Sequence, residues 1–372
     1  MMKWTVLSDN RTCNDQLQTE HGLSILLETE KHRILLDTGA SDVFIRNAET
    51  LGIDLSKVDY VFISHGHSDH AGGLKHFMEI NDKAKVIVSP DALKSRFYSK
   101  RRYLHSITTE WSDIPQERLL TIEHSESIDE DIFILAHIPQ IHPMPEGNQH
   151  LFIEKTDGSY VNDDFRHELA LYTDGLLFTG CAHSGLENIL AACPFPVNTV
   201  VGGFHLLDNH ESEDKLSELA YRLTDAYPQT QFYTSHCTGD AVFATLHQVM
   251  GDKIHAFSCG TTIKLKWPFL RMNKVRITAI RQTVYPDLMA KYENPIEHTC
   301  DVKEGQQWIS ENGECPEGMC PAAWYSMREF VESLARGKGN FYDGWMKNPM
   351  SAMISCNDGF RPFSFYIEVI DD

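Results

Sequence analysis

The chain has 372 residues, of which 42% are hydrophobic and 10% aromatic, and its net charge is −20. This length exceeds what one hydrophobic core usually holds, so we expect two ordered globular domains. The acidic balance excludes a general nucleic-acid binder, because phosphate neutralisation needs a basic surface. The nine cysteines are odd in number and irregularly spaced, which favours free thiols or metal ligands over a disulfide framework.

Two observations bear on location. The opening "MMKWTVLSDN" lacks the apolar core of a signal peptide. No later run approaches the length of a membrane span. We therefore expect a cytoplasmic protein without a membrane partner.

The first third of the chain predicts alternating strands and helices. Strands are expected at 3–8, 23–28, 33–37 and 84–90, and helices at 41–52 and 71–81. The run "VDYVFIS" is almost continuously apolar, which is typical of a strand buried on both faces. The segment from 91 to 165 is polar and irregular, and we expect it to form a lid.

One stretch of that segment is basic. "KSRFYSKRRY", residues 94–103, places five basic residues in ten positions. It could be a solvated helix or loop face, or an anion-binding lid on an otherwise acidic protein. The residues alone leave both readings open.

After residue 165 the alternation of strands and helices returns. "HELALYTDGLLFTGC" predicts a hairpin that turns at Asp174-Gly175, and a single closing strand is expected at 254–265. Predicted strand ends coincide with potential ligands: His65, Cys181, His205 and His236. Layered α/β folds place their sites at such ends. The pattern breaks near 270, so we expect an α/β domain at 1–268 and a small α+β domain at 272–372.

The densest group of potential ligands is "HGHSDH", which holds His65, His67, Asp69 and His70. A spacing of two suits a tight turn after a strand, because a helix would put such positions on different faces. One carboxylate beside three imidazoles matches Zn(II), Mn(II) or Fe(II) and fits two adjacent ions. A bound metal lowers the pKa of its water to about 7 and polarises a substrate oxygen.

"SHGHSDHAGG", preceded by "LLDTG", resembles the HxHxDH signature of the metallo-β-lactamase superfamily. Five further blocks resemble, in order, one branch of it, the 7,8-dihydropterin-6-yl-methyl-4-(β-D-ribofuranosyl)aminobenzene 5'-phosphate synthase family: "VLSDNRT", "EHGLSILLET", "FTGCAHSGLENIL", "VVGGFHLL" and "SHCTGDAVFATL". The resemblance covers residues 3–265. It implies an αβ/βα sandwich that holds two divalent metal ions, with zinc as first choice and manganese or iron as alternatives.

The resemblance also implies roles for the residues of the motif. His65 and His67 would bind the first ion and Asp69 and His70 the second, while Asp37 would orient the ligand loop.

Two later positions depart from the pattern of the superfamily. Cys181 stands where many relatives have a bridging aspartate, and Asp164 and Glu168 occupy the region just upstream. We expect His183 to substitute as a ligand and His236 to close the site.

The roles of two residues remain open, since His205 and Cys181 could each be a ligand or a substrate-facing group. The candidates for a catalytic role are Asp69, His183 and His205. Cys237 should point away from His236 if the strand continues, so we expect it to be a packing residue.

The substrates of this family carry phosphate, which favours the anion-binding interpretation of the basic stretch. Arg96, Arg101 and Arg102 could bind the phosphate through charge-assisted hydrogen bonds. The expected function is a dinuclear metal-dependent hydrolase or transferase acting on a small phosphorylated, pterin-like or heterocyclic substrate. A metal- or thiol-based ligand sensor without turnover is the alternative, and a homo-oligomer is compatible with either.

The C-terminal domain resembles a small domain that also occurs alone, and the resemblance implies no activity for it. The matching pieces are "VRITAIRQTV", "CDVKEGQQWI", "CPEGMCPAAWYSM" and "SCNDGFRPFSFYIE". Its four cysteines, Cys300, Cys315, Cys320 and Cys356, could form a four-thiolate site or remain buried or redox-idle thiols.

Overall fold

The computed structural model divides the chain into two compact units, Met1–Trp267 and Pro268–Asp372. The structure describes residues 2–111, 114–207, 211–265, 273–296, 300–311, 313–335, 337–342 and 344–370. The boundary predicted near 270 falls outside these residues. Among the described helices, none combines the length and the apolar character needed to cross a bilayer.

The N-terminal unit is built on two seven-stranded sheets. The first runs in the order β18 (Thr262–Leu265), β1 (Met2–Ser8), β2 (Ser24–Glu28), β3 (Arg33–Leu36), β4 (Tyr60–Phe62), β5 (Lys85–Val88), β8 (Leu119–Thr121). The second runs β17 (Ile254–Ala256), β16 (Gln231–Thr234), β15 (Thr199–Val201), β14 (Leu176–Phe178), β13 (Ala170–Thr173), β10 (Ile132–Leu135), β9 (Glu126–Asp129). In the first sheet β3, β4, β5 and β8 run parallel, and in the second sheet β14, β15, β16 and β17 run parallel. The carboxyl ends of these strands therefore share one edge in each sheet.

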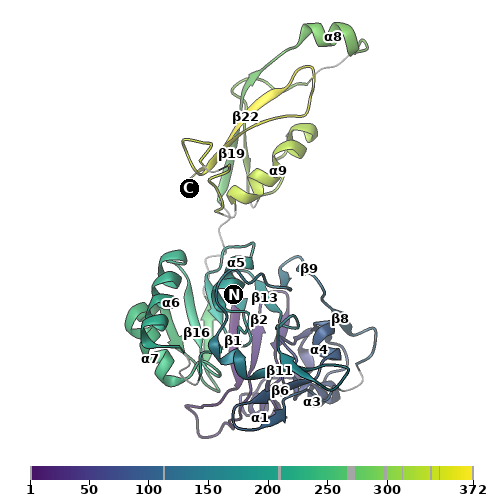
Figure 1. Cartoon of the computed structure of the whole chain (residues 1–372). Coiled ribbons are helices and arrows are strands. Elements are labelled where there is room, and N and C mark those ends of the chain that lie inside the picture. The colour runs from purple at the N-terminus through teal and green to yellow at the C-terminus, as the bar shows by residue number, and fades with distance from the viewer. Residues whose placement is uncertain are drawn as a thin grey trace. The chain divides into compact units, whose positions relative to one another are not determined.

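Helices cover the outer face of each sheet. The first sheet packs against α1 (Val43–Thr50), α3 (Leu74–Ile80) and α4 (Pro90–Lys94), and the second against α5 (Leu186–Ala192), α6 (Glu213–Ala226) and α7 (Asp240–Met250). Figure 1 shows α6 and α7 on one side of this unit and α3 and α4 on the other, with the strands between them. The predicted αβ/βα sandwich is confirmed.

The almost continuously apolar run "VDYVFIS" contains β4, which is buried on both faces. Val61 and Ile63 belong to the cluster under the helices, whereas Phe62 belongs to the cluster between the two sheets. Successive side chains of a strand point to opposite faces, so both faces of β4 are buried. Phe62 meets Phe178 of the second sheet edge-to-face, with ring centroids 6.0 Å apart.

The prediction of an irregular middle segment is wrong. Residues 91–165 add β8 to the first sheet, add β9 and β10 to the second, and build a separate four-stranded sheet. That sheet runs β12 (Tyr160–Asn162), β11 (Leu151–Glu154), β6 (Phe97–Lys100), β7 (Leu104–Ser106). All residues of β7 and β12 are exposed, so these strands lack the apolar alternation that identifies a strand in sequence.

The predicted closing strand at 254–265 is two strands. β17 pairs in parallel with β16, and β18 pairs with β1 of the other sheet. The turn between them contains Gly260 at φ +87°, a conformation that L side chains rarely adopt. The chain therefore passes from one sheet to the other within a few residues.

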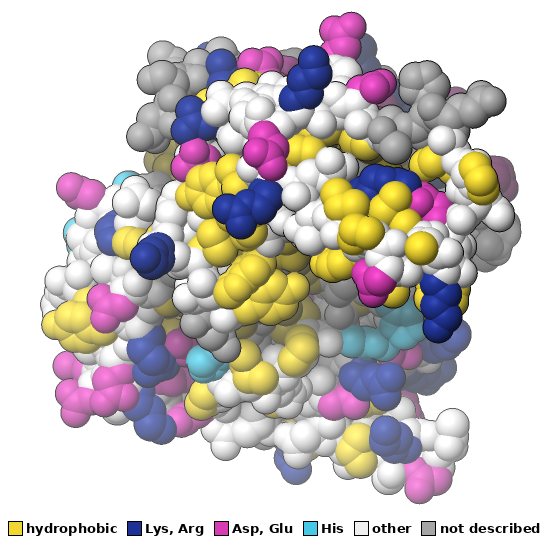
Figure 2. All heavy atoms as spheres, turned by 90° about the horizontal axis from the view of Figure 1, so that it is seen from above, with side chains coloured by type: hydrophobic (Ala, Val, Ile, Leu, Met, Phe, Trp, Pro, Cys, Tyr) yellow, Lys and Arg dark blue, Asp and Glu magenta, His cyan; other side chains and the backbone are white. Residues whose placement is uncertain are grey.

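The C-terminal unit is a four-stranded antiparallel sheet with helices. Its strands run β20 (Gln307–Ser310), β19 (Lys274–Gln282), β22 (Phe363–Ile370), β21 (Ser351–Ser355). The helix α9 (Pro321–Ala335) buries Ala323, Met327, Val331 and Leu334 in the core of this unit, at helical spacing, while α8 (Pro286–Tyr292) buries no residue. On the face drawn in Figure 2, acidic and basic side chains lie interspersed among hydrophobic ones.

The packing between the two sheets of the N-terminal unit yields a prediction about stability. Phe62→Ala should destabilise the N-terminal unit by about 3–5 kcal/mol, because the buried ring leaves a cavity against Phe178. Tyr221→Ala on α6, where the side chain is 60% exposed, should change stability by less than about 0.5 kcal/mol. Urea unfolding followed by circular dichroism measures both. Equal midpoints for the two variants would contradict this account of the core.

Candidate metal centre

The first group of candidate ligands follows β4 in the turn that leads to the short helix α2 (Ser68–Ala71). His65, His67 and His70 are all buried. Gly66 permits this crowding, because a Cβ there would lie 2.3 Å from the ring of Phe97. His65 and His67 lie in this turn, as the spacing of two predicts, whereas Asp69 and His70 lie in α2, where we did not expect a helix.

Asp37 holds this turn in place. It is fully buried, has φ +56°, and follows β3. Its Oδ1 accepts the backbone N–H of Ser64 at 2.7 Å, and its Oδ2 accepts the Ser64 hydroxyl and His70 Nδ1, both at 2.7 Å. The structure thus brings Asp37 to the ligand loop in the orienting position that the resemblance implies.

These bonds determine which nitrogen of each ring faces the centre. The Ser64 hydroxyl proton goes to Asp37, so Ser64 Oγ accepts from His65 Nδ1 at 2.9 Å. His70 Nδ1 likewise donates to Asp37. With the proton on Nδ1, the Nε2 atoms of His65 and His70 keep a lone pair, which is the form of imidazole that binds metals.

His183 enters from the loop after β14 with the same tautomer. Asn148 Nδ2 donates to the His183 carbonyl at 2.8 Å, which fixes the amide so that Asn148 Oδ1 accepts from His183 Nδ1 at 3.1 Å. Gly180, at φ +57°, lets this loop approach Ser64, because a Cβ there would lie 2.3 Å from Ser64 Oγ. The structure brings His183 to the centre through a loop conformation that no spacing in the sequence reveals.

Three of these histidines form the first candidate position. The ligand nitrogens of His65, His67 and His183 lie within 4.8 Å of one another. Their Nε2 atoms are buried and have no hydrogen-bond partner among the described residues. Burial lowers the pKa of His65, His67 and His183, which favours the neutral form of each ring. Three orphaned imidazole nitrogens that face one point fit a divalent metal ion.

The second candidate position gathers Asp69, His70 and His236. His70 Nε2 lies 3.1 Å from His236 Nε2, and Asp69 Oδ2 lies 3.3 Å from His236 Nε2. His236 Nδ1 donates to Asn10 Oδ1 at 3.1 Å, and its backbone N–H donates to Asp9 Oδ1 at 3.0 Å. The Asn10 amide and the Asp9 carboxylate therefore turn the Nε2 lone pair of His236 toward His70.

Two lone pairs at 3.1 Å repel each other unless a cation lies between them. The directions of the pKa shifts of His236 and Asp69 agree with this need for a cation. Burial opposes the charge on His236, but the hydrogen bond and charge of Asp69 prevail and raise the pKa of His236 to about 9. Burial also opposes ionisation of Asp69, but His70, His236 and His21 hold its pKa well below the usual range. A proton or a metal ion satisfies this arrangement, so these residues also fit a divalent ion.

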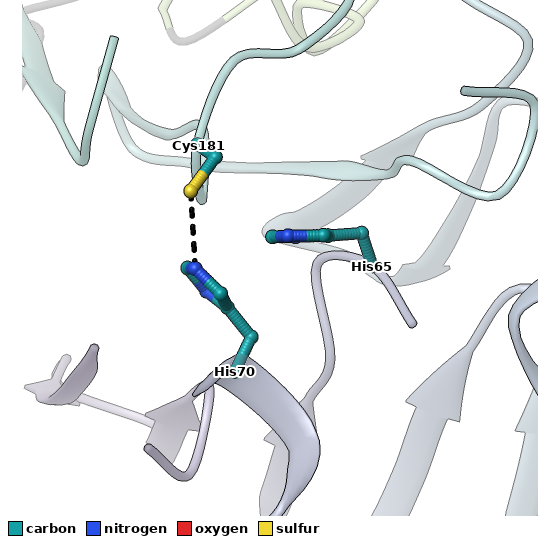
Figure 3. Close-up of side chains that lie close together, drawn as sticks. All are labelled: His65, His70 and Cys181. Atoms are coloured by element: carbon teal, nitrogen blue, oxygen red, sulfur yellow. Dashed lines mark hydrogen bonds between the residues drawn. The ribbon is translucent and has the colours of Figure 1, made fainter. Parts of the chain in front are cut away.

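Cys181 lies between the two positions. Its Sγ is 3.1 Å from His70 Nε2, and Figure 3 shows the thiol facing the rings of His70 and His65. Cys181 belongs to a candidate ligand group with His65 and His70, and to another with His183 and His205. The sulfur thus occupies the place between the two ligand sets that the resemblance assigned to a bridging group.

Cys237 does not point away from His236 as we expected. Its Sγ lies 3.1 Å from Cys181 Sγ, and both thiols are buried. The expectation required the strand alternation to continue past His236. β16 ends at Thr234, and His236 has φ +52°, so the alternation is broken before Cys237.

His205 also reaches the centre. It is 7% exposed, has φ +49°, and both ring nitrogens lack a hydrogen-bond partner within the described part of the chain. Its ring centroid lies 4.1 Å from that of His183. Gly203 precedes it in tight contact with Cys237, since a Cβ there would meet Cys237 Sγ at 2.4 Å.

Sequence reasoning missed several residues that support the centre. His167 Nδ1 accepts the N–H of Gly66 at 3.1 Å and its Nε2 pairs with Asp163 at 3.0 Å, so both nitrogens are occupied. His21 stacks on His236 at 5.0 Å, and its Nε2 lies 3.4 Å from Asp69. The only signal for His21 was its place in the "EHGLS" block.

The two carboxylates that we noted upstream of Cys181 differ in burial and in hydrogen-bond partners. Glu168 is buried and accepts the backbone N–H groups of His183 and Ser184 at 2.6 and 2.7 Å. Asp164 is exposed and accepts the N–H of Arg166. Glu168 therefore shapes the loop that carries His183.

A cavity opens onto both candidate positions. It is lined by His21, His67, Ser68, Asp69, Ser99, Arg101, His105, Ile107, Leu151, Cys181, His183, His205, Leu207 and Cys237. Of the three arginines predicted to bind phosphate, Arg101 lines this cavity. Arg96 instead lies 3.9 Å from Glu154, and Arg102 is exposed.

The comparisons with known proteins agree with this geometry. The family model described as the metallo-beta-lactamase superfamily matches residues 18–146. The chain is 32% identical over 252 residues to the uncharacterized protein MJ0448 of Methanocaldococcus jannaschii, a match that covers 66% of this chain and 93% of the relative. It is 29% identical over 265 residues to the 7,8-dihydropterin-6-methyl-4-(beta-D-ribofuranosyl)-aminobenzene-5'-phosphate synthase of the same organism, covering 63% and 87% of the two chains.

A solved structure supports the same assignment. Tm1679, described as a metal-dependent hydrolase of the beta-lactamase superfamily, superposes with a TM-score of 0.61 at 29% identity, covering 71% of this chain and 99% of its own. This chain therefore belongs to the metallo-β-lactamase superfamily, whose fold implies binding of divalent metal ions.

Proposed function

We propose that this protein is a dinuclear metal-dependent hydrolase that acts on a small phosphorylated, heterocyclic substrate. The observation that carries the proposal is the convergence of two ligand sets on one cavity. His65, His67 and His183 form one set, while Asp69, His70 and His236 form the other, and His67, His183 and Asp69 line the cavity. Cys181 lies between them.

The number of protein ligands in each set suits catalysis. Three protein ligands leave a coordination position open to water or substrate, which distinguishes catalytic from structural zinc sites. Ions held here would lower the pKa of a water molecule and polarise a phosphoryl oxygen. The residues of the cavity then have to bind the substrate, orient it and supply a proton to the leaving group.

His205 is suited to the proton transfer. It lines the cavity beside His183, and neither of its ring nitrogens bonds to a described residue, so one nitrogen is available to a substrate atom. Imidazole is the commonest general acid and base in enzymes. We assign His205 the role of holding and donating the proton that the leaving oxygen requires.

Arg101 gives the cavity a cationic side chain, and His105 adds an imidazole. Both residues line it, and both are exposed at its mouth. Guanidinium groups bind phosphate through paired charge-assisted hydrogen bonds. This supports a phosphorylated substrate, in keeping with the relative that is named as a phosphate synthase. A condensation that forms such a phosphate is the second candidate reaction, since that relative matches along 87% of its length.

The proposed reaction can be tested with a panel of phosphate esters and pterin precursors. Zinc- or manganese-loaded protein should turn over at least one of them, and His67→Ala should lower kcat/KM by about a hundredfold or more while the circular dichroism spectrum is kept. His247→Ala on α7, a histidine that does not line the cavity, serves as the matched control. Full activity in the His67 variant would refute the proposal.

The proposed phosphate-binding role predicts different effects on KM for the neighbouring residues Arg101 and Arg102. Arg101→Glu should raise KM for a phosphorylated substrate about tenfold or more, because a charge-assisted hydrogen bond in the cavity becomes a repulsion. Arg102→Glu makes the same charge change at an exposed neighbour, so KM should stay within about twofold. Steady-state kinetics of the two variants measure the difference. Equal effects of the two variants on KM would show that the arginines act through the overall electrostatic field of the protein and not through a direct contact with phosphate.

A further inference from the structure

A second thiol, that of Cys237, lies beside Cys181 and His236 at the second candidate metal position. The two thiols come from the ends of different strands, Cys181 after β14 and Cys237 after β16. Their sulfur atoms are 3.1 Å apart, closer than the about 3.5–4.0 Å at which carbon atoms pack. The two groups therefore interact directly and do not merely fill space.

The surroundings of Cys237 suit a thiolate. The backbone N–H of His205 donates to Cys237 Sγ at 3.3 Å, and hydrogen bonds of this kind stabilise negative charge on sulfur. Gly203 leaves room for the sulfur, since any Cβ at that position would overlap it. Cys181, His236 and Cys237 present their ligand atoms within 4.8 Å of one another.

The burial of Cys181 and Cys237 also supports a metal-binding role for the two thiols. Cys181 is 3% exposed and Cys237 5% exposed, yet both line the cavity. A packing role would be met by any small apolar side chain. Two adjacent thiols beside an imidazole, with a route to solvent, form instead the donor set that soft and borderline metal ions prefer.

We infer that Cys237 is a second thiol ligand at the position formed by Asp69, His70 and His236, and that this position takes a thiophilic ion such as Zn(II), Co(II) or Cd(II) in preference to Mn(II). This inference rests on the proposed function, since it specifies the metal class of the same site. Binding converts the Cys237 thiol to a thiolate and releases one proton to solvent, without transfer of electrons.

Cobalt substitution of the full-length protein tests the inference. Thiolate-to-Co(II) charge transfer absorbs in the near ultraviolet in proportion to the number of sulfur–cobalt bonds. If Cys181 contacts both positions and Cys237 one, Cys237→Ser should remove about a third of this absorbance and Cys181→Ser about two thirds. Cys193→Ser replaces a thiol in the loop after α5, outside the candidate groups, and should leave it unchanged.

A competition measurement supplies a second readout that does not depend on turnover. The ratio of zinc to manganese affinity should fall about tenfold or more in Cys237→Ser, because a soft donor has been replaced by a hard one. Cys237→Ala takes the place of the serine variant if the latter does not fold, with circular dichroism as the criterion.

The outcomes separate this inference from the proposed function. Unchanged absorbance and unchanged metal preference in Cys237→Ser, with two ions still bound, would overturn the thiol ligand and leave the hydrolase standing. The predicted losses in a protein that turns over none of the phosphate esters would support the thiol ligand and overturn the hydrolase. Wild-type protein that binds no cobalt would overturn both.

Discussion

The imidazoles of His70 and His236 face each other with their Nε2 atoms 3.1 Å apart, and neither ring is free to turn away. His70 is held at Nδ1 by Asp37, and His236 is held at Nδ1 by Asn10. Both rings therefore direct a lone pair at the same point, which is stable only around a cation. Although burial opposes the charge, the hydrogen bond and charge of Asp69 raise the pKa of His236 to about 9, so a positive charge is favoured at this point, and a metal ion would supply one. Asp37 follows β3 and Asn10 follows β1, so the first sheet carries both groups that hold these two rings.

The two ligand sets follow from this arrangement but differ in chemistry. The first consists of imidazoles only, and burial holds the pKa of His65 and His183 well below the usual value. The second consists of a carboxylate and two imidazoles, with the thiols of Cys181 and Cys237 beside them. The cavity thus joins a position of nitrogen donors to a position of mixed donors. That asymmetry suits a pair of ions in which one activates and the other holds.

Most of the layered fold and half of the centre could be predicted from the sequence, for a physical reason. His65, His67, Asp69 and His70 are local in sequence, and a buried strand before a tight turn is visible as an apolar run. The orientation of Cys237 could not be predicted, because it depends on the positive φ of His236 beyond the end of β16. The roles of His21 and His167 depend on contacts with residues far away in the chain. The exposed strands β7 and β12 were missed because they have no buried face.

The central claim is that two separate ligand sets each hold one divalent ion, and metal analysis of matched variants tests it most directly. Protein purified without chelators and loaded with zinc should contain two ions per chain in the N-terminal unit, His183→Ala should lose the ion of the first set, and His236→Ala that of the second. Anomalous scattering from crystals of the three proteins would locate each ion. Two ions with separate losses are the result that this account predicts. A single ion that disappears in both variants, or wild-type protein without any ion at these residues, would contradict it.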